Sequence, residues 1–195
     1  MGYSSGSGKP SLVVDGIVFV VRETEERIRY TASYWEEKVE IPTQEEECHK
    51  QGSRPPWIVL AEDNLPDVYL IQEALDQEGL DCRLDTIGDG DEVLNFIDHL
   101  EANPHLRCPN LFVVDLNLPK RSGAEILSRL RRSGHCSEVP AIVISSSDAP
   151  RDLDLAKAMR VTLYFRKPSE LKEFMKIGAH IRTVLNEHQS SKPPV

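Results

Sequence analysis

The chain has 195 residues, of which 39% are hydrophobic and 28% are charged, a balance that is typical of a folded globular protein and excludes a fully disordered one. Its formal net charge of -9 argues against direct binding to nucleic acid, whose phosphates attract Lys and Arg. Because no hydrophobic run reaches the roughly 20 residues of a membrane helix, we expect a cytoplasmic protein without a membrane segment.

Residues 1–53 differ in composition from the rest of the chain, and we expect them to form an N-terminal extension. They open on a Gly/Ser-rich stretch that resembles a linker, and residues 42–53 are again polar. The pair Asp15-Gly16 separates two short apolar runs, which predicts a β-hairpin with a two-residue turn. The charge-rich segment 24–41 is compatible with either helix or strand.

From residue 54 on, short apolar runs alternate regularly with amphipathic segments. Each run has the length and the Val, Ile and Leu content of a buried strand. The alternation predicts an α/β fold with a doubly wound, five-stranded parallel sheet and helices on both faces. We expect the strand order 2-1-3-4-5, which is the order of known flavodoxin-like sheets. The expected strands are Trp57–Ala61, Cys82–Ile87, Leu111–Val114, Ala141–Ile144 and Thr162–Phe165.

Helices are expected between these strands. Asn64 can cap the first of them, with Pro66 in its opening turn. In the last helix Gly178 is unfavourable, since glycine lowers helix stability by about 1 kcal/mol relative to alanine. The other expected helices are residues 89–100, 123–132, 149–159 and 168–188. We therefore expect one domain over residues 54–188 and a tail over 189–195, which leaves no room for a further output domain.

Polar side chains follow the expected strands where each strand ends. Glu62 and Asp63 follow the first strand, Asp115 the third and Ser145 the fourth, and Lys167 comes shortly after the fifth. Since carboxyl ends of parallel strands share one edge of a sheet, these side chains should converge. Taken singly, each has an ordinary alternative as a helix cap, a turn residue or a solvated lysine.

The chemistry of this set fits together as a phosphoryl-transfer site. Clustered carboxylates repel one another unless a cation neutralises them, and oxygen ligands suit Mg²⁺. Asp115 would attack a phosphorus atom and become an aspartyl phosphate. Lys167 would pair with the phosphoryl anion, and Ser145 would donate a hydrogen bond to it.

At these residues the sequence resembles the receiver domain of two-component response regulators, over about residues 57–188. The segments that carry the resemblance are Ile58–Asn64, Asp115–Pro119, Pro140–Ser145 and Lys167-Pro168, in this order. Residues 67–71 and 109–120 are most similar to single-domain regulators that partner bacterial phytochromes. The stretch 159–162 departs from the family, because it lacks the usual small-residue turn.

The resemblance implies a function. A sensor histidine kinase, with a bacteriophytochrome as the candidate, would phosphorylate Asp115 in a Mg²⁺-dependent reaction. The domain would then signal through the face formed by residues 149–159, 162–165 and 168–188, which binds a downstream protein or a second copy of the chain. The peptide bond before Pro168 is usually cis in this family.

The resemblance also implies a role for each residue of the site. Mg²⁺ would be held by carboxylates and by one backbone carbonyl, a hydroxyl and an aromatic ring would form a switch pair, and two further positions would tune hydrolysis of the phosphoryl group. The metal ligands are Glu62, Asp63, Asp115 and the carbonyl of Asn117; the switch pair is Ser145 and Tyr164; the tuning positions are Asn117 and Ser147.

Three alternative functions fit these residues less well. A degenerate receiver would bind a partner without phosphorylation, but every core position is filled. A Mg²⁺-dependent phosphatase with an Asp nucleophile would need an acid two residues later, where Asn117 stands. A nucleotide-binding loop at Gly6-Ser7-Gly8-Lys9 is excluded, because the glycine spacing is wrong and Pro10 comes next. We therefore expect a switch that catalyses only its own phosphotransfer and slow dephosphorylation.

The cysteines give no sign of a disulfide framework or of a metal site. None forms a Cys-x-x-Cys pair, and Cys48-His49 has no further ligands at metal spacing. We expect free thiols in a reducing cytosol, with a disulfide as the alternative. The four cysteines are Cys48, Cys82, Cys108 and Cys136.

Overall fold

The computed structural model describes residues 11–14, 17–20 and 54–190, and the chain divides into two compact units, Met1–Pro42 and Thr43–Val195. In the first unit, β1 (Ser11–Val14) and β2 (Ile17–Val20) pair antiparallel, as the predicted hairpin requires. Its Asp-Gly turn lies outside the described residues, as do the remaining segments expected up to residue 53 and the last five residues. The predicted domain boundaries therefore stay predictions.

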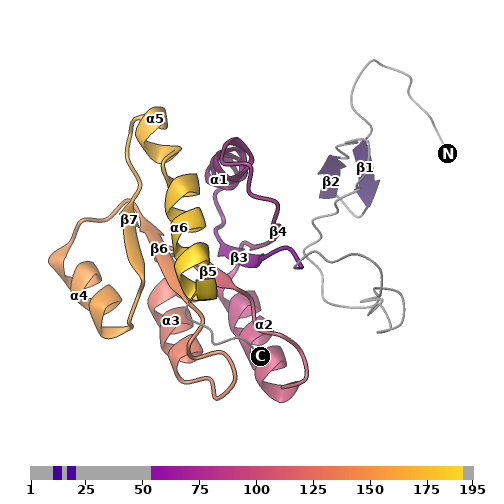
Figure 1. Cartoon of the computed structure of the whole chain (residues 1–195), viewed down its shortest axis with the longest axis vertical. Helices are drawn as coiled ribbons and strands as arrows, with labels where there is room; N and C mark the ends of the chain where they lie inside the picture. Colours follow the sequence, from indigo (N-terminus) through magenta and orange to yellow (C-terminus); the bar gives the residue numbers. More distant parts are fainter. Residues whose placement is uncertain (1–10, 15–16, 21–53, 191–195) are drawn as a thin grey trace. The chain divides into compact units, whose positions relative to one another are not determined.

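The second unit contains a five-stranded parallel sheet, with strands in the order β4-β3-β5-β6-β7 (Figure 1). Counted from β3, this is the predicted 2-1-3-4-5 order. Each strand lies within one residue of its expected bounds. The strands are β3 (Trp57–Ala61), β4 (Arg83–Ile87), β5 (Leu111–Asp115), β6 (Ala141–Ser145) and β7 (Leu163–Arg166).

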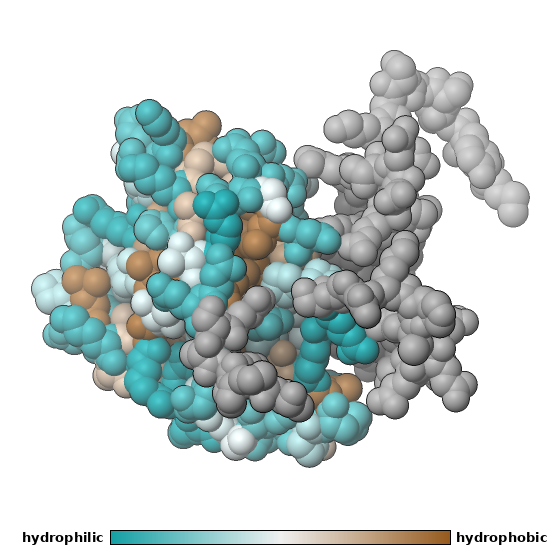
Figure 2. Space-filling model, viewed as in Figure 1, coloured by the Kyte–Doolittle hydropathy of each residue, from teal (hydrophilic) through white to brown (hydrophobic). Residues whose placement is uncertain are grey.

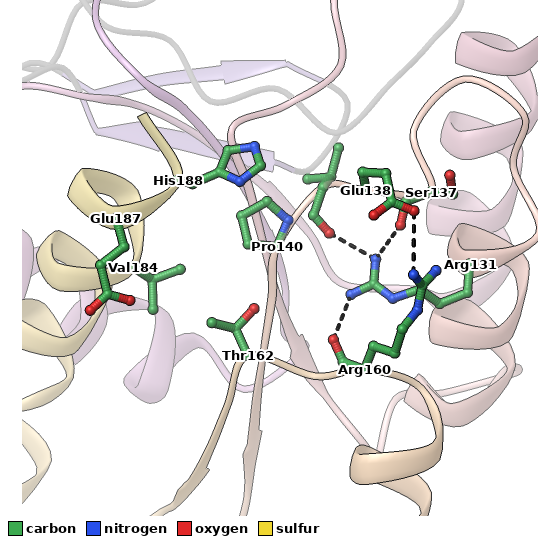
Figure 3. A pocket seen from close by; sticks show the side chains of 10 residues that line it. Arg131, Ser137, Glu138, Pro140, Arg160, Thr162, Val184, Glu187 and His188 are labelled. Atoms are coloured by element: carbon green, nitrogen blue, oxygen red, sulfur yellow. Dashed lines mark hydrogen bonds and ion pairs between the residues drawn. The ribbon is translucent and has the colours of Figure 1, made fainter. Parts of the chain in front are cut away.

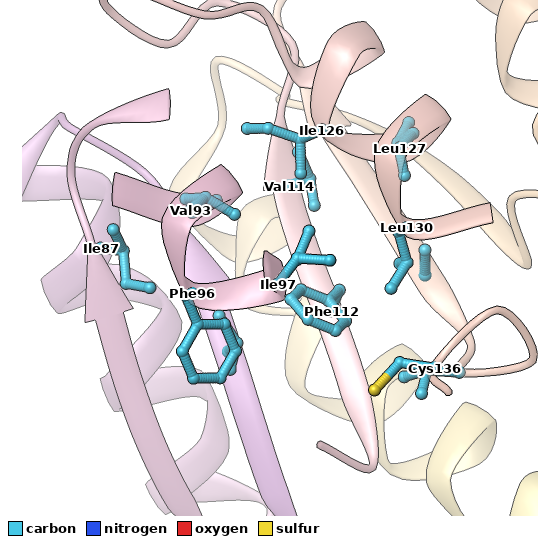
Figure 4. Close-up of a cluster of buried hydrophobic side chains, with 14 of the residues drawn as sticks. Ile87, Val93, Phe96, Ile97, Phe112, Val114, Ile126, Leu127, Leu130 and Cys136 are labelled. Carbon is cyan, nitrogen blue, oxygen red and sulfur yellow. The ribbon is translucent and has the colours of Figure 1, made fainter. Parts of the chain in front are cut away.

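Helices cover both faces of this sheet, as predicted, and each face has its own hydrophobic core. The helices α2 and α3 pack with one set of strand residues, which include Phe112 and Val114 of β5 (Figure 4). The helices α1 and α6 pack with the other set, which includes Leu111 and Val113. The helices are α1 (Leu65–Gln77), α2 (Gly90–Ala102), α3 (Gly123–Arg131), α4 (Pro150–Ala158), α5 (Leu171–Phe174) and α6 (Ile177–Ser190).

The expected last helix is divided in two, and this corrects the prediction of one continuous helix over residues 168–188. The break falls between Phe174 and Ile177, two residues that are both buried against the sheet. Gly178 then lies against α1 so closely that a Cβ atom would collide with the carbonyl of Ala74. The glycine that weakens the helix is therefore required by the contact between α1 and α6.

The loop before β7, which departs from the family pattern, is held by one arginine. Arg131 of α3 donates hydrogen bonds to the carbonyls of Ser137 (2.8 Å), Val139 (2.7 Å) and Met159 (2.8 Å), and its guanidinium also reaches the carbonyl of Arg160. Arg160 has a φ of 51°, a left-handed conformation that non-glycine residues rarely adopt. Figure 3 shows the bonds from Arg131 to Ser137 and to Arg160, beside a surface hollow of about 320 Å³.

The structure contradicts the expectation of free thiols at two of the four cysteines. Cys108 and Cys136 form a disulfide, with their Cα atoms 5.8 Å apart, whereas Cys82 is a buried cysteine outside the disulfide. Cys108 lies just before β5 and Cys136 just before β6. Because these neighbouring strands are parallel, the loops that lead into them meet at the same edge of the sheet, although 28 positions separate the cysteines.

The surface view in Figure 2 is largely hydrophilic, with hydrophobic residues in small groups. Among the described residues, the large exposed hydrophobic side chains are Leu65, Tyr69, Leu153 and Leu171. No described helix has the length and hydrophobicity needed to span a lipid bilayer.

Candidate functional site

The predicted polar residues meet at the carboxyl-terminal edge of the sheet. Asp115 and Ser145 are the last residues of the adjacent strands β5 and β6, and Glu62 directly follows β3. Lys167 directly follows β7, where its amide donates a 2.7 Å hydrogen bond to the carbonyl of Ser145. Parallel pairing thus brings four segments that are distant in the sequence to one place.

The ammonium group of Lys167 lies at the centre of the site. It donates hydrogen bonds to carboxylate oxygens of Asp115 at 2.6 Å, of Glu62 at 2.8 Å and of Asp67 at 2.8 Å. The side chains of Lys167, Glu62 and Asp115 are 13%, 0% and 8% exposed. Three charge-assisted hydrogen bonds in a largely buried site fix the position of this cation.

Burial and charge act in opposite directions on these groups. Burial lowers the pKa of Lys167, but the hydrogen bonds to its three carboxylate partners outweigh burial and raise the pKa well above its usual range. Burial raises the pKa of Glu62, and the hydrogen bond from Lys167 counteracts only part of that increase. Lys167 is therefore charged at neutral pH, whereas Glu62 carries a carboxylate whose ionisation is disfavoured by its surroundings.

Asp67 belongs to the site and was missed as a site residue. It lies in the first turn of α1, and its carboxylate faces Lys167 from the helix. The signal that could have identified it is its place one turn beyond Glu62 and Asp63, in a helix that starts at the same edge of the sheet. Spacing along the strands alone does not reveal a residue contributed by the following helix.

The helix cap that was expected of Asn64 is absent, and the backbone amide of Asn64 binds Glu62. The side chain of Asn64 makes no capping hydrogen bond to α1. Instead, the Asn64 amide donates to Glu62 Oε1 at 3.0 Å, while Glu62 Oε2 accepts from Lys167. Both carboxylate oxygens of Glu62 are thus engaged, and a metal would have to compete for their remaining lone pairs.

Asp63 and Asn117 are differently placed. Both are exposed, and the Asp63 carboxylate makes no hydrogen bond or ion pair with any described residue. The amide of Asn117 donates to Asp115 Oδ1 at 2.8 Å, whereas its carbonyl accepts no hydrogen bond from the described part of the chain. Both oxygen groups are therefore free to act as ligands.

The charges of the site fit a hard divalent cation. Four carboxylates, on Glu62, Asp63, Asp67 and Asp115, stand against the single ammonium of Lys167 among these five side chains, an excess of three negative charges. Oxygen donors with room for water are the environment that Mg²⁺ prefers. The Asp63 carboxylate, the free lone pairs of Asp115 and the Asn117 carbonyl could hold such an ion.

The loop that follows Asp115 is fixed by close packing. A Cβ atom on Gly123, the first residue of α3, would collide with the carbonyl of Asp115, so this position requires glycine. Lys120 adopts a φ of 63°, and its ammonium lies 2.5 Å from the carboxylate of Asp89, which caps α2. The contact with Lys120 lowers the pKa of Asp89 below its usual value.

A chain of hydrogen bonds joins the two residues of the predicted switch pair. The hydroxyl oxygen of Ser145 accepts a 3.1 Å bond from the amide of Ser147, and Tyr164 donates a 2.8 Å bond to the carbonyl of Ser147. The hydroxyl of Ser147 in turn donates to Asp152 in the first turn of α4, at 2.6 Å. Ser145 is fully buried and Tyr164 partly so.

One expectation about this edge is wrong. No cis peptide bond occurs among the described residues, so the bond between Lys167 and Pro168 is trans. The trans isomer of a bond before proline is more stable than the cis isomer by about 0.5–1 kcal/mol. The resemblance to the family was therefore not enough to establish a cis bond here.

The chain is similar to known proteins over its second unit. A family model described as the response regulator receiver domain matches residues 58–178. The response regulator Rcp1 of Synechocystis sp. is 30% identical over 127 residues, which cover 65% of this chain and 86% of that protein. The crystal structure of the phosphorylated cyanobacterial phytochrome response regulator RcpA is 29% identical, with a TM-score of 0.62, and the match covers 72% of this chain and 99% of that one. A crystal structure of the Mn²⁺-bound form of Rcp1 is 28% identical, also with a TM-score of 0.62, and covers 72% of this chain and all of that one (100%).

Proposed function

The chain belongs to the response regulator receiver domain family, and on that premise we propose that Asp115 accepts a phosphoryl group from a sensor histidine kinase in a Mg²⁺-dependent reaction. The observation that carries the proposal is the contact of the Asp115 carboxylate with Lys167 at 2.6 Å, inside a cluster of carboxylates. A buried carboxylate beside a fixed cation, with a surplus of negative charge nearby, is suited to accept a phosphoryl group once a metal ion is bound.

The transfer forms one bond and breaks one. An oxygen of Asp115 attacks phosphorus, an acyl phosphate forms, and the bond between phosphorus and the histidine nitrogen of the kinase breaks. Lys167 keeps its proton and supplies a positive charge to the phosphoryl oxygens, and the Ser145 hydroxyl donates to one of them. Mg²⁺, held by Asp63, Asp115 and the Asn117 carbonyl, would offset the charge of the phosphoryl group.

Signalling would follow from the Ser145 hydroxyl. Its oxygen accepts from the Ser147 amide, and turning toward a phosphoryl group would break that bond. Because Ser147 also binds Tyr164 and Asp152, the change would reach β7 and α4 together. The face made by α4, β7, α5 and α6 would thereby change its affinity for a downstream protein or for a second copy of the chain. Ser147 and Asn117 would tune hydrolysis of the phosphoryl group.

The kinase would dock at the same edge of the sheet. Leu65 and Tyr69 lie on the first turns of α1, and Leu171 begins α5; these side chains are 65%, 56% and 60% exposed. Exposed apolar groups beside a reactive carboxylate are suited to contact a partner helix. Similarity to the phytochrome response regulator RcpA supports a sensor kinase of the phytochrome class, and hence a cytoplasmic location.

Phosphotransfer from a kinase labelled on its histidine tests this proposal. The label should move to the wild-type chain in the presence of Mg²⁺ and remain on the kinase when EDTA is present. Asp115→Asn should accept no label. The control Asp148→Asn changes an exposed carboxylate that pairs with Arg166, and it should accept the label normally. Absence of transfer from every kinase and from small phosphoryl donors would favour a receiver that binds its partner without phosphorylation.

A further inference from the structure

A second cluster of reactive side chains lies away from the phosphorylation site. Cys108, His135 and Cys136 are in the loops that lead into β5 and β6, at the opposite edge of the sheet from Asp115. A sulfur or ring-nitrogen atom from each lies within 4.8 Å of the others. Figure 4 shows Cys136 at the margin of the hydrophobic cluster that contains Phe112.

We propose that in the reduced protein Cys108, His135 and Cys136 bind a thiophilic divalent cation of the zinc class, and that the disulfide between the two cysteines closes this site. Two thiolates and one imidazole are ligands that zinc prefers, and three protein ligands leave a fourth tetrahedral position for water. With bonds of about 2.0–2.3 Å, neighbouring ligand atoms of such a site lie about 3.3–3.8 Å apart. In the structure the two sulfur atoms are bonded to each other, so reduction must first let them separate to that spacing, with the histidine nitrogen already within 4.8 Å of both.

A hydrogen bond to the backbone leaves one ring nitrogen of His135 available as a ligand. Its Nε2 lies 2.7 Å from the carbonyl oxygen of Leu106, which can only accept a hydrogen bond. The proton is therefore on Nε2, and the lone pair of Nδ1 is free. Metal-bound histidines usually donate their other ring N–H to a carbonyl or a carboxylate in this way, and that contact fixes both the tautomer and the ring.

The turn that carries two of the ligands is held without help from the disulfide. Glu101 of α2 accepts hydrogen bonds from the hydroxyl of Ser133 and from the amides of Gly134 (3.1 Å) and His135 (3.4 Å). The Ser133 hydroxyl accepts from the amide of Cys136 at 3.0 Å. These contacts, together with the bond between His135 and Leu106, would keep the three ligands together after reduction.

The redox step is balanced by a dithiol reductant. The reductant passes two electrons and two protons to the disulfide between Cys108 and Cys136, which breaks to give two thiols. The reductant itself is oxidised from a dithiol to a disulfide. Metal binding then releases both thiol protons as the two sulfur–metal bonds form. In a reducing compartment the dithiol form prevails, so the metal would be bound there and lost on oxidation.

Cobalt binding to the full chain tests the proposal, since thiolate ligands give Co²⁺ a sulfur-to-metal charge-transfer absorption. Reduced wild-type protein under anaerobic conditions should bind one equivalent of Co²⁺ with this absorption, and Zn²⁺ should displace it. The oxidised protein should show none of it. His135→Gln should weaken binding more than ~10-fold, because loss of even an outer-shell partner costs about 10–100-fold.

Matched variants identify the ligands. Cys108→Ser and Cys136→Ser should each abolish the absorption, whereas Cys82→Ser, Cys48→Ser and Asp115→Asn should retain it. The comparison of oxidised with reduced wild-type protein needs no substitution and remains valid if a variant folds poorly. A reduced wild-type protein without the absorption would overturn the proposal. An absorption that persists in the double variant of Cys108 and Cys136 would overturn it as well.

Discussion

Replacing Lys167 with methionine, which keeps the length of the side chain and removes its charge, should destabilise the protein strongly. The side chain of Lys167 is 13% exposed and its ammonium binds Glu62, Asp67 and Asp115, so the substitution leaves three clustered carboxylates without their cation. Removing one partner of a buried ion pair costs about 3–5 kcal/mol. We therefore expect the free energy of unfolding of Lys167→Met, measured by urea denaturation at pH 7 without divalent cations, to fall by about 3 kcal/mol.

The pH and metal dependence of this loss are also fixed by the structure. Burial raises the pKa of Glu62, and the hydrogen bond from Lys167 is the largest contribution that opposes the rise, so the variant should raise it further. A group with a raised folded pKa stabilises the fold below its unfolded pKa and loses that contribution as the pH rises through the folded value. The deficit should therefore shrink as the pH falls from 7 toward about 4.5, and Mg²⁺ should also reduce it.

The neighbouring Arg166 provides the control. Its guanidinium pairs at 3.1 Å with Asp148, and both side chains are well exposed, at 64% and 71%. Exposed pairs contribute about 0–1 kcal/mol, so Arg166→Met should have a small effect that does not respond to Mg²⁺. If the free energy of unfolding of Lys167→Met lies within about 0.5 kcal/mol of the wild-type value at every pH, the carboxylates do not depend on this cation and the reasoning is refuted.

Three further outcomes are expected. Tyr164→Phe should lower the free energy of unfolding by about 0.5–1.5 kcal/mol, because the bond to Ser147 is lost, and should leave phosphorylation unchanged while weakening its effect on partner binding. Gly178→Ala should lower the thermal midpoint by an amount equivalent to about 1–3 kcal/mol, although alanine favours helices; an unchanged midpoint would contradict the contact with α1. In Lys120→Met the pKa of Asp89, followed by NMR titration, should rise toward its usual value of about 3.9. Because the folded pKa of Asp89 is depressed, its stabilisation in the wild type is lost as the pH falls below about 3.9, and an unshifted titration in the variant would disprove the role of Lys120.

The strands were the most predictable part of the fold. In β3, β5 and β6 every residue is buried, so each strand reads in the sequence as a continuous apolar run with a polar residue at its end. The regular alternation indicated a parallel sheet covered by helices, and the order 2-1-3-4-5 came from the known order of flavodoxin-like sheets. That order was sufficient to bring Asp115, Ser145 and Lys167 to one edge.

Features that depend on contacts between elements were not predictable in the same way. Asp67 joins the site only because α1 starts beside Lys167, and nothing in its local sequence distinguishes it from an ordinary acidic residue in a first helical turn. Asn64 was expected to cap α1 because of its residue type, but the amide of Asn64 is instead bound by Glu62. The requirement for Gly178 comes from the packing of α6 against α1.

The disulfide could have been deduced from the predicted topology. Cys108 and Cys136 precede strands that were expected to be neighbours, so their loops had to approach one another. The expectation of free thiols relied on spacing along the chain and on compartment, which carry no information about contacts across a sheet. Distance in the fold, and not distance in the sequence, decides whether two cysteines can pair.

The central claim, that Asp115 is the phosphoryl acceptor, is tested most directly by intact-mass spectrometry after incubation with acetyl phosphate. With Mg²⁺ the wild-type chain should gain the mass of one phosphoryl group, and hydroxylamine should remove it, as expected for an acyl phosphate. Asp115→Asn should gain none under the same conditions, while Asp67→Asn tests whether the carboxylate on α1 can serve instead. Full phosphorylation of Asp115→Asn would contradict the account.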